Sequence, residues 1–104
     1  MLGLSEVYGA ALAAAAGPAA AAEVTEHVMV ASRGGDIRSL VARTVVHAMR
    51  TAPHAAFAPV PEPEREVIAL ARLARYSVDE IANLLDIAPA EARARMTSGL
   101  RALR

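Results

Sequence analysis

The 104-residue chain contains no cysteine and no lysine, and it has three aromatic side chains in all. Without cysteine it can form no disulfide and no thiolate metal site, and it has no cysteine nucleophile. Its 11 positive charges are all arginine and are balanced by 11 carboxylates, so the net charge is zero. Proteins that coat nucleic acid depend on excess positive charge, so any DNA contact of this chain must be local.

Long hydrophobic runs are also missing. The longest uncharged run, 7–22, is mostly alanine and is interrupted by Gly17 and Pro18, whereas a membrane-spanning helix needs about 20 apolar residues. No arginine precedes Arg33, although a secretion signal begins with positive charge. We therefore expect no membrane segment and a cytoplasmic location.

Alanine, by contrast, is abundant: 26 residues are alanine, nearly half of the 55% that are apolar. Alanine is the best helix former, while strands favour β-branched and aromatic residues. A chain of this length suffices for one small domain or two small helical units. We therefore predict an all-α fold of two small helical units.

Proline separates these units. Pro53 and Pro59 bound a connector at 53–60, which divides the chain into a helical unit at 1–52 and a second unit at 61–104. The apolar spacing in the first unit predicts three helices, ended by Gly17, by Gly34 with Gly35, and by Pro53. Their expected inward faces include Leu4, Val7, Tyr8, Ala11 and Leu12; Val24, His27, Val28 and Ala31; and Ile37, Leu40, Val41, Thr44, Val45 and Ala48. Asp36 is the expected N-cap of the third helix.

The second unit contains a short helix, a tight break and a last helix. Ser77 and Glu80 have the spacing of a capping box, which predicts a helix over 78–85 that buries its apolar side. A break at 86–88 precedes Pro89, which suits the first position of a helix. The expected buried side chains are Ile81, Leu84, Leu85, Ala92, Met96, Leu100 and Leu103. This spacing is that of a helix-turn-helix, and also of a plain corner between two helices.

The segment 61–104 resembles the last domain, region four, of bacterial RNA polymerase sigma factors, most closely the extracytoplasmic-function group. The resemblance rests on Glu64-Arg65-Glu66-Val67, Ser77-Val78-Asp79-Glu80-Ile81-Ala82, Leu84-Leu85, Ile87, Arg93, Arg95 and the ending Arg101-Ala102-Leu103-Arg104. LuxR-type regulators share part of this pattern, but the ending is more similar to sigma factors. The resemblance implies a helix-turn-helix domain that binds promoter DNA in the context of RNA polymerase.

The first unit shows a weaker resemblance to sigma region two. Val24-Thr25-Glu26-His27-Val28-Met29 is similar to the sigma helix that contacts the polymerase, which implies Thr25, Glu26, Met29 and Val30 as partner contacts. The family's base-capturing loop is reduced to 33–35, and Leu40 stands where the family has tryptophan. Capture of single-stranded DNA needs stacking and cationic groups, so we expect no promoter melting by this unit.

The DNA-facing side of the last helix is opposite its buried stripe. It carries Ala90, Glu91, Ala94, Thr97, Ser98 and Arg101, with Arg93 and Arg95 beside it and Arg75 as a further phosphate contact. Three or four neutralised phosphates predict a log-log salt slope of about −3 to −4, so double-stranded DNA should bind weakly to the chain alone. Asp86 replaces the family's glycine in the turn, and Ala88 replaces a serine cap.

Two functions remain open at this stage. One is a transcription regulator of the sigma type that binds DNA; the other is a sigma-like interaction protein that binds RNA polymerase, a sigma factor or an anti-sigma factor without DNA. The histidines lack the spacing of a helical metal pair, so we expect no enzyme, catalytic residue, metal or cofactor. Val30 and Val46 lie off the main apolar stripes and are either a dimer or partner surface, or scattered surface residues.

Overall fold

The computed structural model describes residues 4–31 and 36–103, and these form α-helices and one short 3₁₀ helix, with no strand among them. The all-α prediction is confirmed. The elements are α1 (Leu4–Ala14), α2 (Pro18–Ala31), α3 (Ile37–Thr51), η1 (Ala55–Phe57), α4 (Glu62–Leu73), α5 (Val78–Leu85) and α6 (Pro89–Ala102). The predicted stop at Gly34 and Gly35 lies outside the described residues.

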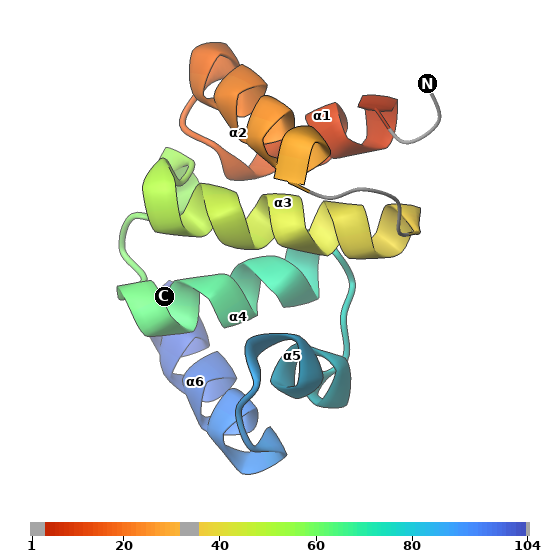
Figure 1. The fold of residues 1–104 in the computed structure, drawn as a ribbon. Helices are drawn as coiled ribbons and strands as arrows, with labels where there is room; N and C mark the ends of the chain where they lie inside the picture. The colour runs from red at the N-terminus through yellow and green to blue at the C-terminus, as the bar shows by residue number, and fades with distance from the viewer. Residues whose placement is uncertain (1–3, 32–35, 104) are drawn as a thin grey trace.

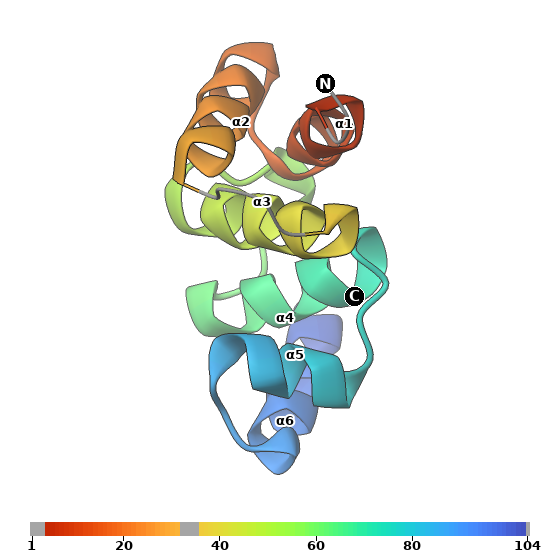
Figure 2. The same ribbon diagram turned by 45° about the vertical axis from the view of Figure 1, so that its right-hand side comes forward.

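The molecule measures 37 × 26 × 17 Å. The helices are stacked in layers along its longest dimension. α1 and α2 lie on one side of α3, and α4 lies on its other side (Figure 1). α5 and α6 cover the far side of α4, as the turned view also shows (Figure 2). The contact between α3 and α4 therefore joins the part before the proline-rich connector to the part after it.

The predicted helix starts at α3, α5 and α6 are confirmed. The Asp36 carboxylate accepts a hydrogen bond from the Ser39 backbone N–H at 3.2 Å. Ser77 and Glu80 form both bonds of a capping box, so two backbone N–H groups that a helix start leaves unpaired are satisfied. α6 begins at Pro89, whose missing N–H costs nothing in a first helical turn.

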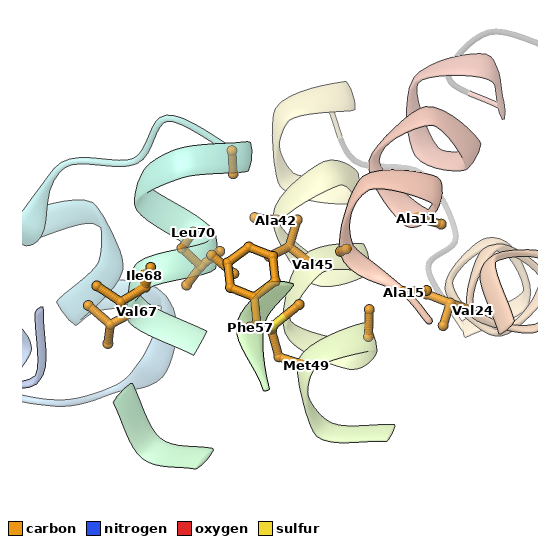
Figure 3. Packing of buried hydrophobic residues seen from close by; sticks show 14 of the residues in the cluster. Ala11, Ala15, Val24, Ala42, Val45, Met49, Phe57, Val67, Ile68 and Leu70 are labelled. Carbon is orange, nitrogen blue, oxygen red and sulfur yellow. The ribbon is translucent and has the colours of Figure 1, made fainter. Parts of the chain in front are cut away.

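The connector is mostly exposed, but two of its side chains are packed into the core. Phe57 is buried between Val45 and Met49 of α3 and Leu70 of α4 (Figure 3), and Val60 is fully buried nearby in the chain. Nε of Arg65 donates to the backbone oxygens of Phe57 and Val60 at 3.3 and 3.1 Å. One core therefore runs through both parts of the chain.

None of the described helices is long and apolar enough to span a membrane.

Two ion pairs also cross from α3 to the second part of the chain. Arg50 donates through Nε and Nη2 to the carboxylate of Glu66, which is buried on α4. Arg38 donates to both carboxylate oxygens of Glu80 at the start of α5. Each pair has two hydrogen bonds and thus fixes the angle as well as the distance between its helices.

Several large side chains that the sequence placed inside are exposed. On α1, Val7 and Ala11 are buried as predicted, but Leu4, Tyr8 and Leu12 are exposed. Three residues of other helices are also exposed, namely His27, Ile37 and Leu84. Ala11 and Ala14 are fully buried where α1 packs against α2 and α3, as is Ala15 just after the helix, because small side chains let helices approach closely. In an alanine-rich helix, the spacing of the large residues therefore does not identify the buried face.

On α6 the predicted stripe is wrong at one position. Ala92 is buried, and Met96 and Leu103 are half-buried, but Leu100 is 43% exposed. Gly99 takes the inward position instead: a Cβ there would lie 2.6 Å from Cγ1 of Ile68 on α4. The absence of a side chain at Gly99 allows α6 to approach α4, and this turns Leu100 toward solvent.

Candidate nucleic-acid interface

The candidate interface is built on α5 and α6, which contact each other and are joined by residues 86–88. Ala82 is buried on α5, where its backbone oxygen accepts a hydrogen bond from the N–H of Ile87 at 3.0 Å. Asp86 has left-handed backbone angles, φ 56° and ψ 50°, which a glycine adopts more readily. The chain thus turns sharply after α5 and leads directly into α6.

The outward side of α6 is solvent-exposed along its whole length. The exposed residues are those predicted from the helical wheel, namely Ala90, Glu91, Ala94, Thr97, Ser98 and Arg101. Four of them are small, and Arg101 is the one residue among them whose side chain can form a bidentate contact with a base.

The arginines beside this side of α6 are in different environments. Arg93 and Arg101 are exposed, and the backbone oxygen of Arg93 accepts a bond from Oγ1 of Thr97 at 3.1 Å. Nε of Arg95 donates to Oε1 of Glu91 at 3.1 Å, and the Arg95 side chain is only 28% exposed. Arg95 is therefore held by a carboxylate on its own helix, which reduces its availability to a phosphate.

Arg75 lies away from α6, in the segment between α4 and α5. It has a positive φ of 57°, and its backbone oxygen accepts a hydrogen bond from Nη2 of Arg38 at 3.3 Å. Its side chain is exposed. The structure thus places Arg75 at the junction with α3, where it borders the start of α5.

This junction is an electrostatic feature that the sequence patterns did not reveal. The Arg38 guanidinium lies 4.3 Å over the ring of Tyr76 and also pairs with Glu80. The bond from Arg38, followed by that from the Ser77 backbone N–H, lowers the pKa of Glu80 to about 2. The capping box indicates the local role of Glu80, but no signal in the sequence links it to Arg38.

The predicted partner contacts on α2 do not form one exposed surface. Glu26 is exposed, Val30 is 72% exposed and Met29 is half-buried. The predicted role of Thr25 as a partner contact must be corrected. Thr25 is buried, and its hydroxyl donates to the backbone oxygen of Ala21 at 2.8 Å. A threonine hydroxyl that bonds one turn back can be buried in a helix without an unpaired polar group, so Thr25 has no surface to offer a partner.

Comparison with known proteins gives no match: no family model, no curated protein and no solved structure is similar to this chain. Within residues 4–31 and 36–103, no three or more side chains of the metal-binding types come together in a way that could hold a metal ion.

Proposed function

We propose that the chain is a transcription regulator of the sigma-factor type, whose α5 and α6 act as a helix-turn-helix that binds promoter DNA in the context of RNA polymerase. The observation that carries the proposal is the uninterrupted exposure of the outward side of α6, next to a shorter helix joined to it by a three-residue turn. A recognition helix needs one free side to enter the major groove and a supporting helix behind it. α4 and α5 support α6 from behind.

The charges on this surface predict weak binding by the isolated chain. Arg93, Arg101 and Arg75 are exposed cations, while Arg95 is paired with Glu91. Arg93 and Arg101 give two phosphate contacts on α6 and a log-log salt slope of about −2; a duplex that also reaches Arg75, away from α6, raises this to about −3. RNA polymerase would therefore supply much of the affinity at a promoter.

The test is the affinity of the full chain for a mixed-sequence duplex, measured by fluorescence anisotropy at low salt, with and without core RNA polymerase. Changing both Arg93 and Arg101 to alanine should weaken binding about tenfold or more, because two phosphate contacts are lost. Arg72→Ala, an exposed arginine on α4, is the matched control and should leave the affinity unchanged. Equal affinities for all three proteins would contradict DNA binding by α6.

A second function is favoured by one observation, the pairing of Glu91 with Arg95 on the candidate interface. A carboxylate on this surface repels phosphate, and the neutral residues around it include none of the long side chains that form bidentate contacts with bases. The second function is that of an interaction protein, which binds RNA polymerase, a sigma factor or an anti-sigma factor without contacting DNA.

The two functions differ in what they predict for the arginine variants. A tagged chain is used to capture purified core polymerase, a sigma factor or an anti-sigma factor. For an interaction protein, Val30→Asp on the exposed part of α2 should abolish capture, while the change of Arg93 and Arg101 to alanine should not affect it. For a DNA-binding regulator, the arginine changes should reduce recovery of promoter DNA together with polymerase. If neither set of changes alters any binding, both proposals fail.

A further inference from the structure

A hollow of about 350 Å³ opens between α2, α3 and α5. Because α2 and α3 precede the connector and α5 follows it, the hollow exists only when the two parts of the chain are packed together. Small-molecule sites in proteins begin at about 300 Å³. The hollow is thus large enough for a small ligand, and it lies apart from the outward side of α6.

One side of the hollow is apolar. Val28 of α2 and Val46 of α3 face it, and the leucines at 84 and 85 close it from α5. Leu84 is partly exposed, although it is a large apolar side chain. An apolar ligand that covers these side chains would remove their surface from water, which favours binding.

The other side of the hollow is basic. Arg43, His47 and Arg50 recur along α3 at i, i+4 and i+7 and so lie on one stripe. No aspartate or glutamate lines the hollow, although the chain as a whole has equal numbers of the two charges. The charged side chains that line the hollow are therefore both arginines, although Arg50 is paired with the Glu66 carboxylate, which does not line it.

Two contacts hold this basic side in place. The buried Glu66 carboxylate binds Nε and Nη2 of Arg50, while the Arg50 side chain stays 57% exposed. The rings of His27 and His47 are stacked, with centroids 4.0 Å apart and planes inclined by 7°. The lining is thus ordered by contacts within the protein, which reduces the entropy lost when a ligand binds.

We propose that this hollow binds a small organic anion, a carboxylate carried on an apolar body such as a medium-length acyl chain. The carboxylate lies against the exposed guanidinium groups of Arg43 and Arg50, whose charge strengthens a hydrogen bond to it. The apolar body packs against Val46 and the α5 leucines. Because the ligand contacts α2, α3 and α5 together, its binding favours the packed arrangement of the two parts over any opened one.

The experiment is a titration of the full ¹⁵N-labelled chain with octanoate, followed by NMR. Saturable shifts should appear at the backbone amides of Val46, His47 and Leu84. 1-Octanol has the same tail without the charge and should bind about tenfold or more weakly, since one charge-assisted contact is lost. Acetate has the charge without the tail and should give no saturable shift. Equal binding of octanoate and 1-octanol would overturn the proposal, as would the absence of saturation by octanoate.

Two pairs of variants locate the site. Arg43→Gln and Leu84→Gln should each weaken octanoate binding about tenfold. Their matched controls, Arg72→Gln on α4 and Val30→Gln on α2, change exposed residues outside the hollow and should leave the affinity unchanged. Circular dichroism confirms that each variant is folded; Arg43 and Leu84 are both exposed, so at least one is expected to tolerate the change. Unchanged affinity in a folded Arg43 or Leu84 variant would overturn the proposal.

Discussion

Arg38 and Glu80 are 42 positions apart in the sequence, yet the Arg38 guanidinium donates to both carboxylate oxygens of Glu80. The same carboxylate accepts the Ser77 backbone N–H in the capping box of α5. A local helix cap and a contact with α3 therefore share one side chain. The contact between α3 and the start of α5 depends on the charge of that carboxylate.

The first prediction concerns Arg38→Gln. Because the bond from Arg38 is the largest cause of the lowered pKa of Glu80, this variant should raise that pKa from about 2 toward its ordinary value of 4.5. In the wild-type protein the pair stabilises the fold above pH 4.5, and this contribution is lost as the pH falls through about 2. NMR titration of the Glu80 side-chain carboxyl carbon measures the shift. An unchanged Glu80 pKa in the variant would show that the capping box alone holds the carboxylate ionised.

The second prediction concerns His47. Burial lowers the pKa of His47 below 6.5, and the nearby His27 and Arg50 lower it further. The folded state thus favours the neutral ring, so His47 contributes stability above about pH 6.5 that is lost as the pH falls below this value. Urea unfolding at a series of pH values should show a steeper loss of stability between pH 6.5 and 5 in the wild type than in His47→Gln. Equal slopes would show that His47 is not responsible.

The third prediction compares two glycines. In Gly99→Ala the new methyl group would meet Cγ1 of Ile68 at 2.6 Å, and such overpacking costs about 1–3 kcal/mol, partly offset by the higher helix propensity of alanine. Gly9→Ala is the matched control, because nothing lies within 4 Å of a Cβ there. Gly9→Ala should stabilise the protein by about 0.5–1 kcal/mol, whereas Gly99→Ala should destabilise it. Chemical unfolding measures both, and effects of the same sign would contradict the close packing of α6 on α4.

The fourth prediction concerns the turn between α5 and α6. Asp86 has a left-handed backbone with φ 56°, so Asp86→Gly should raise the free energy of unfolding by about 0.5–1 kcal/mol. Removing a negative charge from the carboxyl end of α5 acts in the same direction. Ala94→Gly, on an exposed and regular part of α6, should instead lower it by about 1 kcal/mol. Thermal unfolding of the two variants should therefore shift in opposite directions.

Much of the local structure was predictable because it depends on neighbours in the sequence. Ser77 and Glu80 form their capping box within one turn, Asp36 caps α3 in the same way, and Pro89 starts α6. Each of these signals acts over three or four residues, and each helix begins where the signal placed it.

Which side of each helix is buried depends on contacts between residues that are distant in the sequence. Leu100 lies about 80° around the helix from Ala92, at one edge of the predicted buried stripe of α6. Leu100 is exposed because Gly99, and not Leu100, packs against Ile68 of α4. Thr25 is a different case: its hydroxyl bonds the Ala21 backbone oxygen four residues back in α2, so a polar side chain was no reliable sign of exposure there. The sequence predicted the exposed side of α6 correctly. The pairing of Glu91 with Arg95 also has a signal in the sequence, their i, i+4 spacing, which the interpretation of Arg95 as a phosphate contact left out.

The tight contact between Gly99 and Ile68 also has a consequence for the variation of this sequence over generations. Any glycine codon becomes an alanine codon by one base substitution. The chain already has 26 alanines, and an additional alanine is acceptable at an open position such as Gly9. At position 99 the same substitution collides with Ile68, so selection should remove it unless residue 68 becomes smaller. Among descendants of this sequence, positions 68 and 99 are therefore expected to change together.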